Sequence, residues 1–131
     1  MQVMLQRHLG DGFIVESAGL TKELAGRPAN HRSVDCMQKR GIDLNGHKSR
    51  YIGDLGELRQ YRWIICVGSQ EAQKVRAILG TGSASVLIAN EDQGGILDPY
   101  ELGMEGYQAC AALLDRVMPE VARKILATSP L

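Results

Sequence analysis

In 63-WIICVGSQEAQKVRAILGTGSASVLIA-89, two short apolar runs flank a helical pattern, and this arrangement is the clearest indication of the fold class. The first run, residues 63–67, is continuous and of strand length, which predicts a strand covered on both faces. Apolar residues then recur at helical spacing up to Gly80, and a second apolar run follows at 86–88. A strand, a helix and a strand in succession predict a parallel pairing in an α/β fold.

Comparable elements flank this unit on both sides. Helical spacing predicts a first helix over 1–9, a second from Val34 toward Gly41, and a long one after Tyr100 that Pro119 should kink or interrupt. The run Phe13-Ile14-Val15 predicts a short buried strand. The expected order is therefore helix, strand, helix, strand, helix, strand, helix. We expect residues 1–131 to form one domain, since this length suits a single core.

Composition narrows the functional class. The chain has 15 Lys plus Arg and 15 Asp plus Glu, so its formal net charge is zero. This balance predicts no general electrostatic attraction to nucleic acid or to a membrane surface. Cys36, Cys66 and Cys110 form no C-x-x-C pair, which favours a reducing, cytoplasmic compartment over a disulfide framework or a zinc ribbon. The three histidines are isolated, so the sequence predicts no metal site.

The loop 93-QGGILDPYELGMEGY-107 carries the strongest functional signal. Pro99 biases Asp98 away from helix, so the carboxylate is expected on an extended, exposed turn just before the long helix. A carboxylate placed in this way can serve as a general acid when a leaving group lies within reach. On local chemistry alone, an ordinary Asp-Pro turn is the simpler interpretation.

Five stretches together resemble the low-molecular-weight protein tyrosine phosphatase family. They occur in the family's order and spacing and extend over essentially the whole chain: 1-MQVMLQRHL-9, 16-ESAGL-20, 41-GIDLNGHKSR-50, 63-WIICV-67 and 98-DPY-100. The resemblance implies a three-layer α/β/α fold with a short parallel sheet. It also implies hydrolysis of phosphotyrosine or phosphoarginine in proteins through a cysteinyl phosphate, without a metal or another cofactor.

The resemblance assigns roles to four residues. Asp98 would be the general acid that protonates the leaving group, and Tyr100 would line the substrate cleft. Ser17 and His47 would support the phosphate-binding loop by hydrogen bonds from behind. The implied partner is a phosphorylated protein.

The family's nucleophile loop is missing from the 131 residues. In the family a Cys-x5-Arg loop follows the first strand and precedes the helix that here begins at Met1. That loop holds a low-pKa thiolate in a cradle of backbone N–H groups, and its arginine grips the phosphoryl oxygens. The sequence Cys110-AALLD-Arg116 also matches Cys-x5-Arg, but its apolar spacing predicts a helix. In a helix the backbone N–H groups donate to helical carbonyls and cannot bind a phosphate. We therefore expect this chain to be inactive.

Without the family's first strand, which lies between the strands matching 13–17 and 63–67, the sheet would have a gap. It would either close up or borrow a strand from another copy, so a homodimer or strand exchange is expected as one solution. Three functional hypotheses remain. The chain is most of a phosphatase whose true start lies upstream, or a pseudophosphatase acting as a binding or scaffold protein, or an unrelated small α/β domain.

Overall fold

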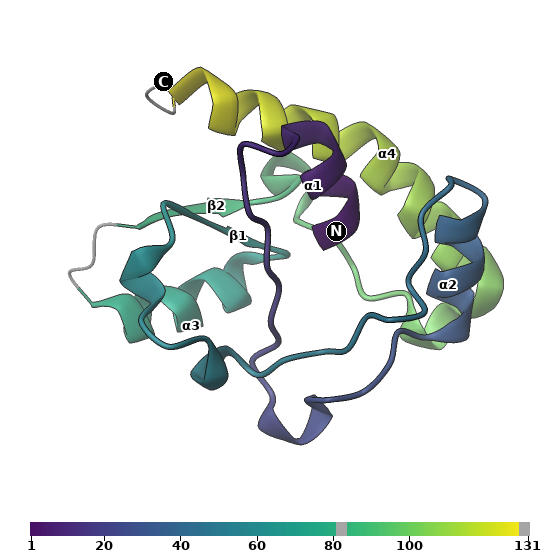
Figure 1. Ribbon diagram of the computed structural model, residues 1–131, viewed down its shortest axis with the longest axis horizontal. Coiled ribbons are helices and arrows are strands. Elements are labelled where there is room, and N and C mark those ends of the chain that lie inside the picture. Colours follow the sequence, from purple (N-terminus) through teal and green to yellow (C-terminus); the bar gives the residue numbers. More distant parts are fainter. Residues whose placement is uncertain (81–83, 129–131) are drawn as a thin grey trace. The chain divides into compact units, whose positions relative to one another are not determined.

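The structure, a computed structural model, describes residues 1–80 and 84–128. The chain divides into two compact units, one comprising Met1–Asp54 with Asp98–Leu131 and the other Leu55–Leu97. Their elements are labelled in Figure 1. The expectation of a single domain over 1–131 stays a prediction.

The unit Leu55–Leu97 contains the parallel sheet. Strands β1 (Trp63–Cys66) and β2 (Ser85–Ile88) pair in parallel, in a register that runs from Trp63 opposite Ser85 to Cys66 opposite Ile88. Helix α3 (Ser69–Leu79) connects them and buries Ala72, Val75 and Leu79. The predicted strand–helix–strand unit is confirmed, and the fold is α/β with a short parallel sheet. Ser69 is the first residue of α3, and Gly68 precedes it as the N-cap.

The other unit is built on the long helix α4 (Gly103–Thr128), against which α1 (Gln2–Leu9) and α2 (His31–Gln38) pack. The buried side chains of α4 recur every three or four residues and so form one stripe. They are Tyr107, Ala111, Leu114, Val117, Met118, Val121, Ala122 and Ile125. Of the two predicted effects of Pro119, a kink or an interruption, the interruption is wrong, because α4 continues through Pro119. Proline removes one helical hydrogen bond, but the buried residues on both sides of Pro119 hold this part of the helix against its neighbours.

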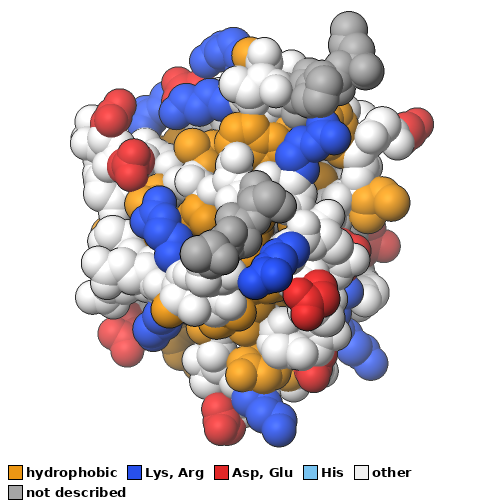
Figure 2. Space-filling model, turned by 90° about the vertical axis from the view of Figure 1, so that its left-hand side faces the viewer, with side chains coloured by type: hydrophobic (Ala, Val, Ile, Leu, Met, Phe, Trp, Pro, Cys, Tyr) orange, Lys and Arg blue, Asp and Glu red, His pale blue; other side chains and the backbone are white. Residues whose placement is uncertain are grey.

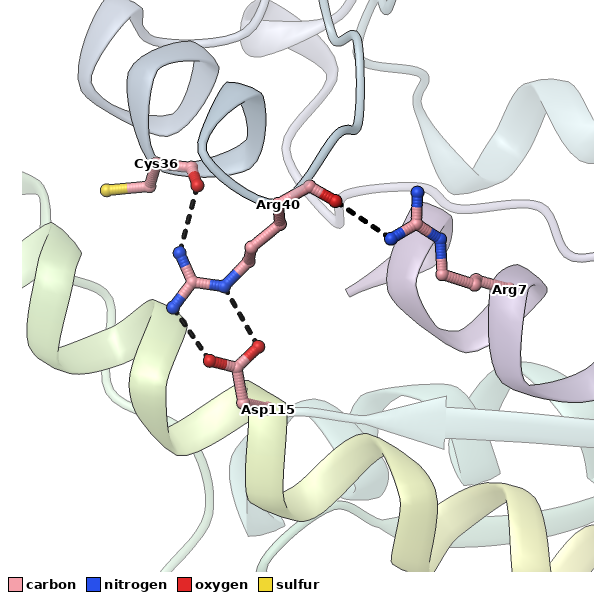
Figure 3. Close-up of polar contacts among 4 residues, drawn as sticks. All are labelled: Arg7, Cys36, Arg40 and Asp115. Atoms are coloured by element: carbon pink, nitrogen blue, oxygen red, sulfur yellow. Dashed lines mark hydrogen bonds and ion pairs between the residues drawn. The ribbon is translucent and has the colours of Figure 1, made fainter.

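A polar network joins these three helices (Figure 3). The Arg40 guanidinium, just after α2, forms a two-pronged pair with the Asp115 carboxylate of α4, with distances of 2.9 and 2.7 Å. It also donates to the carbonyl of Cys36 at 2.9 Å. Arg7 of α1 donates to the carbonyls of Arg40 and Gly41, at the C-terminal end of α2. The two arginines thus satisfy carbonyls that the end of a helix leaves free.

The predicted buried strand at 13–15 is wrong. Residues 13–17 are assigned to no strand, and Ile14 is 86% exposed. Side chains of α1 take the place of a ladder: the Gln6 amide donates to the Phe13 carbonyl at 2.7 Å and accepts from the Val15 N–H at 2.9 Å. Gln2 donates to the Val15 carbonyl at 3.2 Å. An apolar run becomes a strand only where a second backbone pairs with it, and here two glutamines meet those groups instead.

The face drawn in Figure 2 does not carry one dominant charge. On the face drawn in Figure 2, basic, acidic and hydrophobic side chains are interspersed. Within residues 1–80 and 84–128, no helix combines the length and the apolar character needed to cross a bilayer.

Candidate active site

Asp98 lies at a fixed, exposed corner before α4. Its Oδ1 accepts a hydrogen bond from the backbone N–H of Tyr100 at 3.0 Å, so the carboxylate closes its own turn. The short 3-10 helix η5 (Tyr100–Leu102) follows and leads through Gly103, with a φ of 67°, into α4. The sequence expectation of an exposed carboxylate on a turn is confirmed. Its role as a general acid stays a prediction.

Tyr100 presents a large apolar surface beside this carboxylate. It is 66% exposed, and Leu102 in the same turn of η5 is 62% exposed. Exposed aromatic and aliphatic side chains next to a carboxylate suit the wall of a cleft that receives an aromatic or extended ligand. The predicted role of Tyr100 in a substrate cleft fits this exposure and remains untested.

Two further residues join this corner, and sequence analysis did not connect them with Asp98. Tyr107 of α4 is only 7% exposed, and its pKa is raised first by burial and then by the negative charge of Asp98. The guanidinium carbon of Arg32 lies 5.9 Å from the centroid of the Tyr107 ring. Asn30 caps α2 by accepting from the Arg32 N–H at 2.9 Å, which fixes the backbone from which Arg32 extends. The cap was recognisable in the sequence, but the stacking was not.

The segments that carry Ser17 and His47 run side by side. Gly19 donates to the carbonyl of Arg50 at 2.8 Å, two residues beyond Ser17 and three beyond His47. The Ser17 hydroxyl donates to Oε1 of Gln2 on α1. The His47 N–H donates to the carbonyl of Leu44 in a turn, at 3.0 Å. Ser17 therefore lies beside the first turn of α1, and the supporting roles of Ser17 and His47 stay predictions.

The helix α1 lies next to the segment that carries Ser17 and next to α4. Gln2 holds Ser17, and α1 packs against α4, which carries Cys110. Cys110 experiences the charge of Asp98. No acidic residue occupies the first turn of α1, and no side chain caps it. A helix start of this kind favours an anion through its free N–H groups and its dipole.

The thiols of this chain are unsuited to nucleophilic attack. Cys110 and Arg116 lie within α4, as the sequence analysis predicted when it rejected this pair as a loop. Burial raises the pKa of the Cys110 thiol, and it also raises the pKa of Cys66 in β1. A catalytic cysteine needs the opposite shift, because only the thiolate attacks. Cys36 is 3% exposed in α2 and packs in the core.

Comparison with known proteins settles the family. The family model for the low molecular weight phosphotyrosine protein phosphatase matches residues 1–129. The chain belongs to this family. A relative, the probable low molecular weight protein-tyrosine-phosphatase EpsP of Ralstonia solanacearum, is 29% identical over 117 residues, which cover 88% of this chain and 78% of that protein. The resemblance found in the sequence is therefore confirmed.

Solved structures agree on the fold of this low molecular weight phosphatase. A protein tyrosine phosphatase superposes with a TM-score of 0.82 at 26% identity, over 98% of this chain and 87% of the other. Wzb of Vibrio vulnificus, solved in complex with benzylphosphonate, gives a TM-score of 0.80 at 24% identity, over 94% and 86% of the two chains. At the latter identity the likeness shows the fold alone.

Proposed function

We propose that this chain supplies the general acid and the substrate wall of a low-molecular-weight protein tyrosine phosphatase site, with Asp98 as the acid and Tyr100 as the wall. The observation that carries the proposal is the corner at Asp98. Its carboxylate is exposed, held by the Tyr100 N–H at 3.0 Å, and placed ahead of α4 in a chain of this family. Ser17 and His47 are proposed to support the phosphate-binding loop.

The reaction requires a cysteine thiolate that the 131 residues do not provide in a loop. In a complete site the thiolate would attack phosphorus and form a cysteinyl phosphate, while Asp98 protonates the departing oxygen. Water would then attack the same phosphorus with Asp98 as base, releasing phosphate and the thiolate. We therefore propose that the chain as given is inactive, and that its complete form hydrolyses phosphotyrosine or phosphoarginine in proteins.

Hydrolysis of a generic aryl phosphate tests this proposal. The 131-residue chain should show no turnover above buffer, and Asp98→Asn should change nothing measurable in it. The same assay on a version extended by the residues encoded upstream of Met1 should show turnover that falls by about 10²–10⁴ in Asp98→Asn, the range for loss of a general acid. Turnover by the 131-residue chain that depends on Asp98 would contradict its proposed inactivity. An extended version that carries a Cys-x5-Arg loop and still lacks turnover would contradict the proposed reaction.

A pseudophosphatase acting as a binding or scaffold protein is the second candidate. The exposed apolar side chains of Tyr100 and Leu102 favour it, because they form a surface that a partner protein could cover. Intact-mass measurement on the protein isolated from cells separates the two. A species of 14.3 kDa supports the short binding protein, and a heavier species with the nucleophile loop supports the enzyme. A cytoplasmic location, which the free thiols favour, and a homodimer or strand exchange are also proposed.

A further inference from the structure

Arg32 stacks on Tyr107, whose hydroxyl lies within range of the charge of Asp98. The Arg32 guanidinium carbon lies 5.9 Å from the Tyr107 centroid, within the range of a cation–π contact. Tyr107 is buried, so the ring is a fixed platform rather than a mobile partner. Asp98 is near enough to Tyr107 for its charge to raise the pKa of the tyrosine hydroxyl, after the larger effect of burial.

Arg32 is available to a ligand. Within residues 1–80 and 84–128, the two ion pairs formed are Arg40 with Asp115 and Arg50 with Glu16, and neither involves Arg32. Asp98 is therefore not within ion-pair distance of Arg32 in this part of the chain. The first turn of α2 contains no acidic residue, so the helix start adds positive potential at Arg32.

We infer that Arg32 is an oxyanion-binding subsite of the Asp98 corner. A guanidinium restrained on a ring keeps its fork of donors in one orientation, which suits two-pronged contact with a carboxylate or a phosphate. Two sources on a substrate offer this chemistry. One is the phosphate of the phosphorylated residue, and the other is the carboxylate of an acidic residue next to it.

The assignment of this subsite to a substrate rests on the proposed function, whereas anion binding by Arg32 does not. Arg32 would hold either source, and Tyr100, which is exposed and close enough to Tyr107 to affect the pKa of its hydroxyl, would offer an apolar surface nearby. The subsite would thus select peptides by charge, in addition to any contact that the nucleophile loop makes with the phosphate.

Nuclear magnetic resonance titration of the isotope-labelled 131-residue chain tests the inference without requiring turnover. Three peptides are compared: phosphotyrosine with neutral neighbours, phosphotyrosine with aspartates beside it, and unphosphorylated tyrosine with the same aspartates. Binding should shift the Arg32 side-chain N–H and the Tyr107 ring signals, and Arg32→Met should weaken that binding about tenfold, as expected for loss of one charged hydrogen-bonding group. Arg27→Met is the matched control, since Arg27 is exposed and lies on a loop.

Each outcome has one meaning. If Arg32→Met weakens the binding of both phosphopeptides equally, the subsite binds phosphate. If it weakens the binding of the two aspartate peptides only, the subsite binds a neighbouring carboxylate. Equal effects of Arg32→Met and Arg27→Met, or an absence of shifts at Arg32 with all three peptides, would overturn the inference. If Arg32-dependent binding is found while an extended version lacks aryl phosphate hydrolysis, the subsite stands and the proposed reaction fails.

Discussion

Residues 13–17 and strand β1 both contain a short apolar run, but their backbone groups form hydrogen bonds with different kinds of partner. In β1, carbonyls pair with the backbone of β2, as in the hydrogen bond from the Ala89 N–H to the Cys66 carbonyl at 2.9 Å. In 13–17, the Gln6 side chain supplies both a donor and an acceptor to Phe13 and Val15. An apolar run thus predicts an extended backbone, while its partner depends on distant residues.

The alternation of the backbone explains the exposure of Ile14. Successive side chains of an extended backbone point to opposite faces; Phe13 and Val15 are half-buried, and Ile14 between them points to the exposed face. It is 86% exposed, whereas Cys66 at the end of β1 is 5% exposed. We therefore expect small steric changes near β1 to lower the free energy of unfolding strongly. In the segment 13–17 we expect the main loss of stability to come from removal of the glutamine side chains.

The largest effect should come from Gly95→Ala, next to β1. Gly95 has a φ of 99°, and an added Cβ would overlap the carbonyl oxygen of Val67, which accepts from the Ile96 N–H at 2.7 Å. Strain at a positive φ and overpacking together should reduce the free energy of unfolding by about 2–5 kcal/mol. Urea denaturation followed by circular dichroism measures this change.

Gly94→Ala is the matched control for Gly95→Ala. Gly94 has a φ of 87°, but nothing lies within 4 Å of a Cβ placed there. Gly94→Ala should therefore lower the free energy of unfolding only through backbone strain, by about 1–2 kcal/mol. Equal losses for the two variants would show that Gly95 does not pack against the end of β1.

The next effect concerns Gln6, the side chain that replaces a ladder. Gln6→Leu leaves the Phe13 carbonyl and the Val15 N–H without their partner. Because these groups are only partly buried, water recovers some of the loss, and we expect a decrease in the free energy of unfolding of about 1–2 kcal/mol. Hydrogen exchange at the Val15 amide should become faster in the same variant.

Gln38→Leu provides the comparison for Gln6→Leu. Gln38 is exposed at the end of α2, so the same substitution there should stay within about 0.5 kcal/mol. Unchanged protection of the Val15 amide in Gln6→Leu would mean that the segment 13–17 is held by something other than the glutamine.

Sequence patterns predicted the parts of this fold that depend on local order. The apolar runs at 63–67 and 86–88 with a helix between them gave β1, β2 and α3, and the helical spacing after Tyr100 gave α4. The exposed corner at Asp98 was also predicted, because proline acts on its immediate neighbour. The contacts of Gln6 with 13–15 run between a side chain and the backbone across a turn, and the contact of Arg32 with Tyr107 joins residues far apart in sequence. No local periodicity encodes such contacts, so a single sequence could not reveal them.

A smaller effect is expected at the ion pair that joins α2 to α4. The hydrogen-bonded Arg40 guanidinium lowers the pKa of Asp115 below its usual value near 4. The pair therefore stabilises the fold at higher pH and is lost as pH falls through the lowered pKa. Since the Asp115 side chain is 50% exposed, Asp115→Asn should cost less than about 1 kcal/mol at pH 7.

Measurement at two pH values isolates this contribution. The difference in unfolding free energy between wild type and Asp115→Asn should shrink as the pH falls through the lowered pKa of Asp115, where its carboxylate becomes protonated in the wild type. Arg40→Gln combined with Asp115→Asn should cost little more than either change alone, because the two residues form one pair. A difference that stays constant with pH would show that the carboxylate charge does not stabilise the fold.

The smallest effect is expected from a substitution at the exposed Ile14, compared with the same substitution at the buried Ile125. Ile14→Ser should change the free energy of unfolding by less than about 0.5 kcal/mol, because the side chain is already 86% exposed. Ile125→Ser on α4, where the side chain is 3% exposed, should cost several-fold more and serves as the reference. If Ile14→Ser instead destabilises the protein, and does so more at high protein concentration, a second copy covers Ile14. The proposed strand exchange would then act through the segment 13–17, where the glutamines already hold the backbone extended.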